Sequence, residues 1–226
     1  IIVGPAMLIA LIAQVMVKSA FSRYGRVPAS SGLTGAQAAR EMLDQAGLFD
    51  VQIERVSGFL SDHYDPTARV LRLSPDVHDG RSLASVGVAC HEAGHALQHA
   101  REYAPLAVRN LIVPVASIGS NLSWYLIVAG IGLMWLGAAF GHVVAMIGVW
   151  LFGAMVVFQI ITLPVEFNAS SRAKTRLKEM GVIRSPEEEA GVSRVLNAAA
   201  ATYVAATITA LAQLLYFLVL INGRDD

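Results

Sequence analysis

The chain has 226 residues, of which 55% are hydrophobic and 15% are charged, and its 17 basic and 17 acidic residues cancel. Soluble domains carry about a quarter charged residues, so this composition argues against an ordinary soluble domain. The zero net charge gives no indication of a nucleic-acid partner, and the single cysteine, Cys90, excludes an intrachain disulfide.

Residues 1–17 are the first of four stretches apolar enough to cross a bilayer, which takes roughly 20 residues. Because the first residue is Ile1, we expect the natural start to lie upstream and this transmembrane helix to be longer. A signal peptide is the alternative. No basic region precedes the stretch and no small-x-small cleavage site follows it, so a span is favoured.

Residues 18–110 are predicted to form a folded region with both helices and strands. After a linker over 18–35, LTGAQAAREMLDQAG predicts a short helix that begins with a capping box of Thr34 and Gln37. Residues 51–56 are rich in β-branched side chains and predict a strand, and LSDHYDPTARVLRLS predicts a hairpin that turns at Asp65-Pro66. From Arg81 the apolar pattern becomes helical again.

Residues 111–163 predict a transmembrane hairpin, with spans over 117–140 and 142–163. Five glycines are expected to let the helix backbones approach closely, as small residues do in membranes. These are Gly130, Gly132, Gly137, Gly148 and Gly153.

Residues 164–200 predict two further polar helices. Pro164 is expected to open the first, because proline suits the first turn of a helix, and Gly181 to end it. Ser185 and Glu188 form a second capping box, and that helix is predicted to continue into a fourth span over 198–221, within a last segment of 201–226.

The basic residues predict the orientation of the spans. Ten Lys and Arg lie between the first and second spans and six between the third and fourth, whereas the hairpin tip has none. Since basic loops stay cytoplasmic, both polar regions are expected in the cytoplasm and both termini outside.

The stretch ACHEAGHALQHA holds the candidate chemistry. His91 and His95 are four residues apart, so on a helix they share one face and can reach one metal ion, while Glu92 lies beside the ion, where it can hold a water. The alternative is a helix with partly buried, hydrogen-bonded histidines. His99 lies about 12 Å along the axis from His91, too far to share an ion. Cys90 points off this face and is expected to be a small buried residue.

The third ligand is expected from the other polar segment. In LPVEFNASSRAKTR, Glu166 is the acid nearest the third span, and two histidines with one glutamate leave a fourth zinc position open, as in catalytic sites. The alternative for Glu166 is an ordinary charge at a helix N-terminus. Two rival functions remain open: a scaffold whose closed structural zinc site takes His63 or His78 as an extra ligand, and a metal-ion transporter, which the scarcity of ionisable residues in the spans disfavours.

The sequence resembles the YugP-type family of bacterial membrane zinc metallopeptidases. The resemblance covers the N-terminal span, GLTGAQAAREMLDQAGL, LSDHYDPTARVLRLS, GVACHEAGHALQHA, the two-span insertion and LPVEFNASSRA. The layout is also similar to HtpX-like and CAAX prenyl proteases. The resemblance implies that His91, His95 and Glu166 bind Zn2+ and that Glu92 is the catalytic base. Where the similar proteases have an Asp after Glu-x-x-Ala, this chain has Ser170, so Ser170 or Asn168 is expected to replace that contact.

The predicted fold is a mainly α integral membrane protein with four transmembrane helices and a small α+β zincin-like cytoplasmic domain. The predicted function is a gluzincin-like zinc metalloendopeptidase of the plasma (inner) membrane, acting on a peptide or membrane-protein substrate; a homo-oligomer or membrane partner protein is left open. The strand at His63 and Tyr64 is expected to bind an extended peptide, and either residue to stabilise the oxyanion, unless both are structural hairpin residues. Arg172 and Arg176 face either anionic lipid or solvent.

Overall fold

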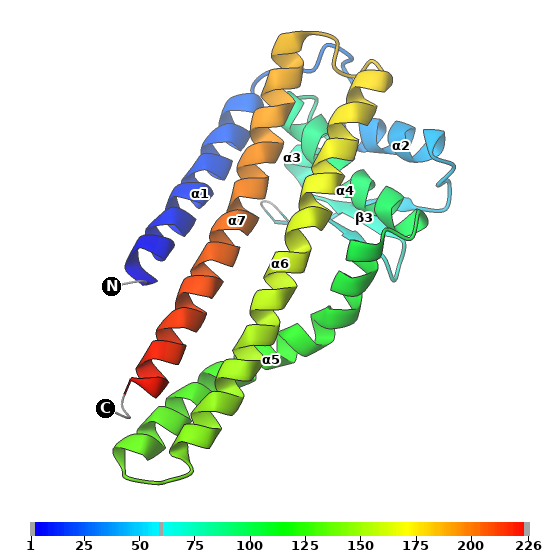
Figure 1. Ribbon diagram of the computed structural model, residues 1–226. Helices are drawn as coiled ribbons and strands as arrows, with labels where there is room; N and C mark the ends of the chain where they lie inside the picture. The colour runs from blue at the N-terminus through cyan, green and yellow to red at the C-terminus, as the bar shows by residue number, and fades with distance from the viewer. Residues whose placement is uncertain (1–2, 59–60, 224–226) are drawn as a thin grey trace. The chain divides into compact units, whose positions relative to one another are not determined.

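The computed structural model describes residues 3–58 and 61–223. The chain folds into two compact units (Figure 1). The span unit comprises Ile1–Ile12, Ala107–Leu163 and Tyr203–Asp226. The sheet unit comprises Ala13–Leu106 and Pro164–Thr202. Each unit is therefore assembled from segments that lie far apart in the sequence.

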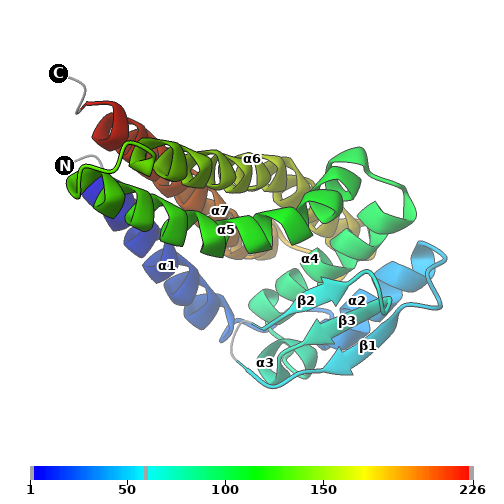
Figure 2. The same ribbon diagram turned by 90° about the horizontal axis from the view of Figure 1, so that it is seen from below.

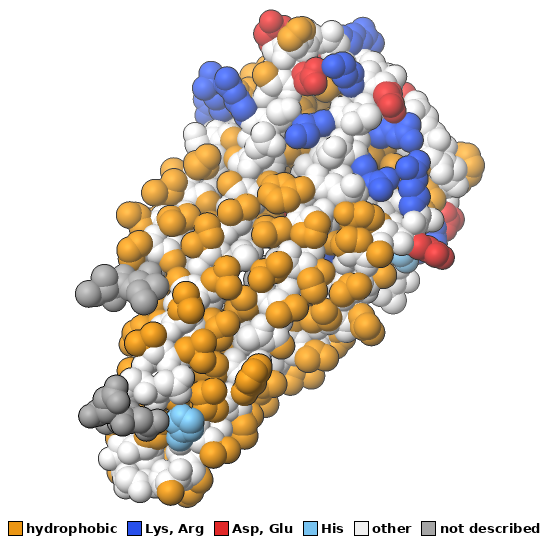
Figure 3. All heavy atoms as spheres, viewed as in Figure 1, with side chains coloured by type: hydrophobic (Ala, Val, Ile, Leu, Met, Phe, Trp, Pro, Cys, Tyr) orange, Lys and Arg blue, Asp and Glu red, His pale blue; other side chains and the backbone are white. Residues whose placement is uncertain are grey.

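Four helices are long and apolar enough to cross a membrane, which agrees with the four stretches predicted. They are α1 (Val3–Tyr24), α5 (Ala104–Trp135), α6 (Gly141–Glu179) and α7 (Pro186–Asn222). In the space-filling view, hydrophobic side chains cover the visible face of the span unit, whereas Lys, Arg, Asp and Glu side chains gather on the sheet unit (Figure 3). An apolar outer surface of this kind suits contact with lipid.

Helix α6 is continuous and contains Pro164, so the prediction that Pro164 opens a new helix is wrong. Proline has no backbone N–H and leaves one carbonyl of the preceding turn without its usual partner. Membrane helices tolerate this because neighbouring groups take up the freed carbonyl. Helix α7, by contrast, runs unbroken from Pro186 as predicted, and Ser185 and Glu188 form the expected capping box with N···O distances of 3.2 and 3.3 Å.

The hairpin of α5 and α6 is only partly as predicted. A Cβ at Gly130 would lie 2.3 Å from the backbone nitrogen of Ala145, and a Cβ at Gly148 would lie 2.8 Å from that of Ile127, so these glycines do allow close packing. A Cβ at Gly132, Gly137 or Gly153 would meet nothing within 4 Å, so the prediction is wrong for these three.

The second predicted span is too long at its C-terminal end. Helix α5 ends at Trp135 rather than at residue 140, and the chain reverses over residues 136–140. Gly137 has a φ of +77°, the left-handed conformation that commonly ends a helix.

The sheet unit contains a three-stranded sheet in the order β1-β3-β2 (Figure 2). The strands are β1 (Gln52–Arg55), β2 (His63–Asp65) and β3 (Val70–Leu73). The predicted hairpin is β2 and β3, which pair antiparallel, while β1 pairs parallel with β3. Strand β2 is therefore an edge strand of this sheet.

Helices α2 (Gly35–Gln45) and α4 (Leu83–Ala100) pack together in the core of the sheet unit, and the short α3 (Pro75–His78) lies between them in the chain. The capping box of Thr34 and Gln37 forms as predicted. Helix α4 begins after Ser82, whose side chain accepts a hydrogen bond from the backbone N–H of Ser85. Its buried apolar side chains join those of α2 and β3 in one core, so α4 is held on several sides.

Helices α4 and α6 approach each other closely at Gly94. A Cβ at this position would lie 2.8 Å from the carbonyl oxygen of Ala169 and 3.3 Å from its Cα. The contact is with backbone, which cannot move aside as a side chain can. The small size of Gly94 therefore allows the close approach of α6 to α4.

We expect Gly94→Ala to force α4 and α6 apart and to lower the free energy of unfolding by about 1–3 kcal/mol, the usual range for overpacking. Gly87→Ala is the matched control on the same helix, since its Cβ would meet only the Val192 side chain, at 3.3 Å. Thermal unfolding of the detergent-solubilised protein measures both. Equal losses of stability in the two variants would contradict a special role for Gly94.

Candidate metal centre

Three side chains from two distant segments meet in the sheet unit. His91 and His95 lie one turn apart on α4, and Glu166 lies on α6, two residues after Pro164. The Nε2 atoms of His91 and His95 lie 3.2 and 3.6 Å from Glu166 Oε2. One ligand atom from each residue lies within 4.8 Å of the other two, so the group can hold one metal ion.

The three side chains of this cluster are buried more deeply than polar side chains usually are. The side chain of Glu166 is 3% exposed, and those of His91 and His95 are 12% and 10% exposed. Buried ionisable groups are stable only when they are paired, hydrogen-bonded or bound to metal. The donor set of two imidazole nitrogens and one carboxylate is the set that Zn2+ takes in catalytic sites, so these residues fit zinc.

The pKa of His95 reflects two opposing influences. Burial lowers the pKa, but the hydrogen bond that the imidazole donates to Glu166 and the negative charge of Glu92 raise it, and the net shift is upward. The cluster thus has a negative character that attracts a cation.

The outer nitrogens of both imidazoles are also hydrogen-bonded. Ser170 Oγ lies 3.1 Å from His91 Nδ1, and Gln98 Oε1 lies 3.0 Å from His95 Nδ1. Both rings are therefore held so that Nε2 points toward Glu166, and such partners orient metal-binding histidines. Of the two residues expected to replace the missing Asp, Ser170 contacts a histidine, whereas Asn168 bonds to Gln98 and Arg172.

Sequence reasoning missed Gln98. This amide is fully buried, and it also donates to the backbone oxygen of Val165 on α6. The available signal was an amide three residues after His95, on the same side of the predicted helix.

Glu92 follows His91 directly and is 9% exposed, so it is a buried acid beside the cluster but outside the three-residue group. Cys90 is fully buried, as expected, and burial raises the pKa of its thiol. A neutral thiol of this kind is inert.

The other histidines in the sheet unit have other partners. His63 Nδ1 lies 2.8 Å from the backbone oxygen of Ser61, and His78 Nδ1 lies 2.7 Å from Asp79. Within the described residues, neither belongs to the metal-binding group, so the extra ligand required by the closed-site scaffold does not come from them.

His99 lies outside the group as well and contacts the sheet instead. Its Nδ1 lies 2.9 Å from the Tyr64 hydroxyl, which joins the C-terminal part of α4 to edge strand β2. Burial raises the pKa of Tyr64, so its hydroxyl stays protonated and able to donate.

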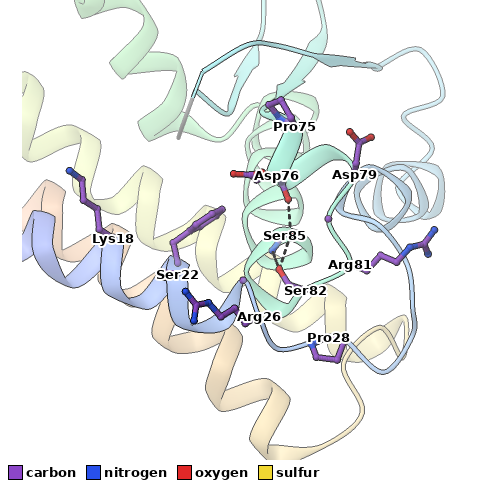
Figure 4. Close-up of a pocket in the computed structure, with 13 residues that line it drawn as sticks. Lys18, Ser22, Arg26, Pro28, Pro75, Asp76, Asp79, Arg81, Ser82 and Ser85 are labelled. Carbon is purple, nitrogen blue, oxygen red and sulfur yellow. Dashed lines mark hydrogen bonds between the residues drawn. The ribbon is translucent and has the colours of Figure 1, made fainter.

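A cavity of about 890 Å³ opens elsewhere in the sheet unit (Figure 4). Lys18 and Arg26 line it from the end of α1 and the residues that follow, and Asp76 and Ser85 line it from α3 and α4. None of its lining residues belongs to the histidine and glutamate cluster. The cavity is therefore distinct from the candidate metal centre.

Comparison with known proteins agrees with a metal-dependent protease. Residues 1–222 match a protein family described as "Putative neutral zinc metallopeptidase". A curated protein from Bacillus subtilis (strain 168), described as "Putative membrane protease YugP", is 51% identical over 215 residues, which is 95% of this chain and 92% of the relative. No solved structure matches the chain. The resemblance seen in the sequence is confirmed.

We expect His99→Ala to keep the wild-type zinc content, because His99 bonds to Tyr64 rather than to the cluster. Loss of that hydrogen bond should lower the free energy of unfolding by about 1 kcal/mol. Metal analysis of the purified variant, beside His95→Ala as the variant that should lose zinc, checks both points. Zinc loss in His99→Ala would show that His99 belongs to the site after all.

Proposed function

The chain belongs to the neutral zinc metallopeptidase family, and on this premise we propose that it is a membrane-embedded zinc endopeptidase. The observation that carries the proposal is the convergence of His91, His95 and Glu166 from two segments that are separated by two apolar spans in the sequence. Burying two imidazoles and a carboxylate costs free energy, and a cation bound between them would offset that cost.

In this proposal, Nε2 of His91, Nε2 of His95 and the Glu166 carboxylate hold Zn2+. When bound, zinc supplies a Lewis acid that polarises the scissile carbonyl and lowers the pKa of water toward neutrality. Three protein ligands leave one coordination position open, as catalytic rather than structural sites do. The buried setting strengthens every electrostatic interaction within the site.

Glu92 acts as the general base. It takes a proton from the attacking water and delivers it to the nitrogen of the leaving amine, so the peptide bond is hydrolysed and the carboxylate is regenerated. Its place on α4, next in the chain to His91, puts it beside the ligands rather than among them.

The peptide substrate binds along β2. This strand lies at the edge of the sheet and pairs only with β3 among the described strands, so its outer edge can add an extended peptide. The Tyr64–His99 hydrogen bond fixes β2 against the helix that carries the proposed ligands. Tyr64 stays protonated, which suits a donor to an oxyanion, and we propose it for that role ahead of His63.

The proposed site faces the cytoplasm. Ten basic residues lie between the first and second predicted spans and six between the third and fourth, and basic loops are retained on that side. Both ligand-bearing segments lie in these two regions, so the orientation is consistent with one shared site. The natural substrates are then peptides or membrane proteins within reach of the inner surface of the plasma membrane.

We expect Glu92→Gln to bind zinc like the wild type but to lose cleavage of a casein-like or membrane-protein substrate by about 100-fold or more, the usual contribution of a general base. Glu41→Gln makes the same chemical change elsewhere in the sheet unit and should cleave normally. If Glu92→Gln cuts as fast as the wild type, the assignment of the base is wrong. A wild type that holds zinc but cuts nothing would favour the structural scaffold.

We expect Glu166→Ala to lose bound zinc, because two imidazoles alone do not retain the ion at ordinary concentrations. Glu179→Ala is the control, an exposed acid on the same helix that bonds to Arg176. Zinc content after dialysis measures both. Full zinc retention by Glu166→Ala would remove this residue from the site.

A further inference from the structure

We propose that Gln98 is a positioning residue of the metal site, whose amide selects the His95 tautomer that presents Nε2 and ties α4 to α6 beside Glu166. This inference rests on the proposed function, since it assumes that His95 Nε2 is a ligand atom. Gln98 lies three residues after His95 and is fully buried. Its side chain contacts His95, Val165 and Asn168 and no solvent, so each of its polar atoms has a defined partner.

The orientation of the Gln98 amide is fixed by the first of two independent contacts. One end of the amide lies 2.8 Å from the backbone oxygen of Val165. A backbone carbonyl can only accept, so the Gln98 atom that faces it must be the NH2 group. This assignment holds whatever the tautomer of His95.

The second contact assigns the same orientation to the Gln98 amide. The same end of the amide lies 3.0 Å from Asn168 Oδ1, and this Oδ1 also lies 2.7 Å from Arg172 Nε. A guanidinium can only donate, so the Asn168 atom between the two must be its oxygen. An oxygen there again requires the NH2 group of Gln98.

The tautomer of His95 follows. With its NH2 group committed to α6, Gln98 can turn only its carbonyl oxygen toward His95 Nδ1, at 3.0 Å. Two lone pairs cannot face each other across a buried contact, so His95 Nδ1 must carry the hydrogen. With a cation bound, the lone pair of His95 is then on Nε2, on the side of Glu166; without a cation, Nε2 faces the Glu166 carboxylate as a hydrogen-bond donor.

His91 has no comparable restriction. Its Nδ1 faces the hydroxyl of Ser170, which can donate or accept and therefore suits either tautomer. Of the two imidazoles, only that of His95 has its tautomer fixed by a neighbouring side chain. Loss of Gln98 should consequently affect His95 more than loss of Ser170 affects His91.

The same amide also joins the two ligand-bearing helices. Val165 directly precedes Glu166, so the hydrogen bond from Gln98 fixes the backbone of α6 at the residue next to the carboxylate. One side chain therefore sets both the ring of His95 and the position of the segment that carries Glu166. A loose ligand set binds metal more weakly, and such outer contacts typically change metal affinity by about 10–100-fold.

The variants Gln98→Met and Gln98→Glu separate the two effects. Methionine has a similar length but makes none of the three hydrogen bonds, whereas glutamate keeps an acceptor for His95 Nδ1 and loses both donors to α6. Ser85→Ala is the matched control, because Ser85 is a buried polar residue on α4 that donates to the backbone oxygen of Asp76. The zinc dissociation constant is measured by chelator competition on the full chain in detergent.

We expect Gln98→Met to weaken zinc binding by about 10–100-fold, Gln98→Glu to weaken it less, and Ser85→Ala to leave it unchanged. The tautomer is read separately from the ring nitrogen NMR signals of the zinc-loaded wild-type protein. We expect the proton of His95 on Nδ1, facing Gln98, and the metal on Nε2. This measurement needs no variant and stands even if Gln98→Met fails to fold.

The proposal is overturned if His95 of the zinc-loaded wild type carries its proton on Nε2, or if folded Gln98→Met binds zinc within twofold of the wild type. Neither readout involves peptide cleavage. Zinc binding that depends on Gln98 in a protein that cuts nothing would therefore reject the peptidase while supporting this inference. Normal cleavage with unchanged zinc affinity in Gln98→Met would do the reverse.

Discussion

The approach of α6 to α4 at Gly94 is the constraint on which the candidate metal centre depends. The absent side chain of Gly94 lets the backbone of Ala169 come within a distance that a Cβ would forbid. His95 follows Gly94 directly, and Glu166 lies one turn before Ala169, so both are carried to the contact by their helices. Without the close approach, a side chain as short as glutamate would not reach the imidazoles.

Polar side chains then give this contact its orientation. Apolar packing between two helices tolerates small rotations and shifts, whereas a buried hydrogen bond has a donor, an acceptor and a direction. Gln98 and Ser170 hold the outer nitrogens of the two imidazoles, and Arg172 orients Asn168, which in turn holds Gln98. Buried polar groups left unpaired are expensive, so the network resists partial rearrangement.

The span unit is held together by apolar packing rather than by a polar network. Its apolar core includes Ile127, Ala145 and Phe152, and the close contacts of α5 with α6 rely on Gly130 and Gly148. Pro164 is the first residue of the sheet-unit segment Pro164–Thr202, and it does not interrupt α6. In soluble proteins a proline often marks the start of a helix. That rule fails for Pro164, because the 39-residue helix α6 has enough other backbone hydrogen bonds to continue through it.

The sequence by itself determined most of the helices and strands and pointed to the candidate ligands. Apolar run length predicts the four long helices, the capping residues Thr34 and Ser185 locate two helix starts, and the spacing of His91 and His95 places them on one face, because all of these depend on neighbours within a few residues. Glu166 was proposed by its chemistry and its place in the chain, not by any local contact.

Only the tertiary structure decided that Glu166 lies within 3.2 Å of His91, that Gln98 bridges two helices, and that Gly94 faces backbone. These contacts join residues more than sixty positions apart, and no periodicity along the chain encodes which side chains will meet across a packed interface. The parallel pairing of β1 with β3 belongs to the same class, since register between strands is set by the whole core.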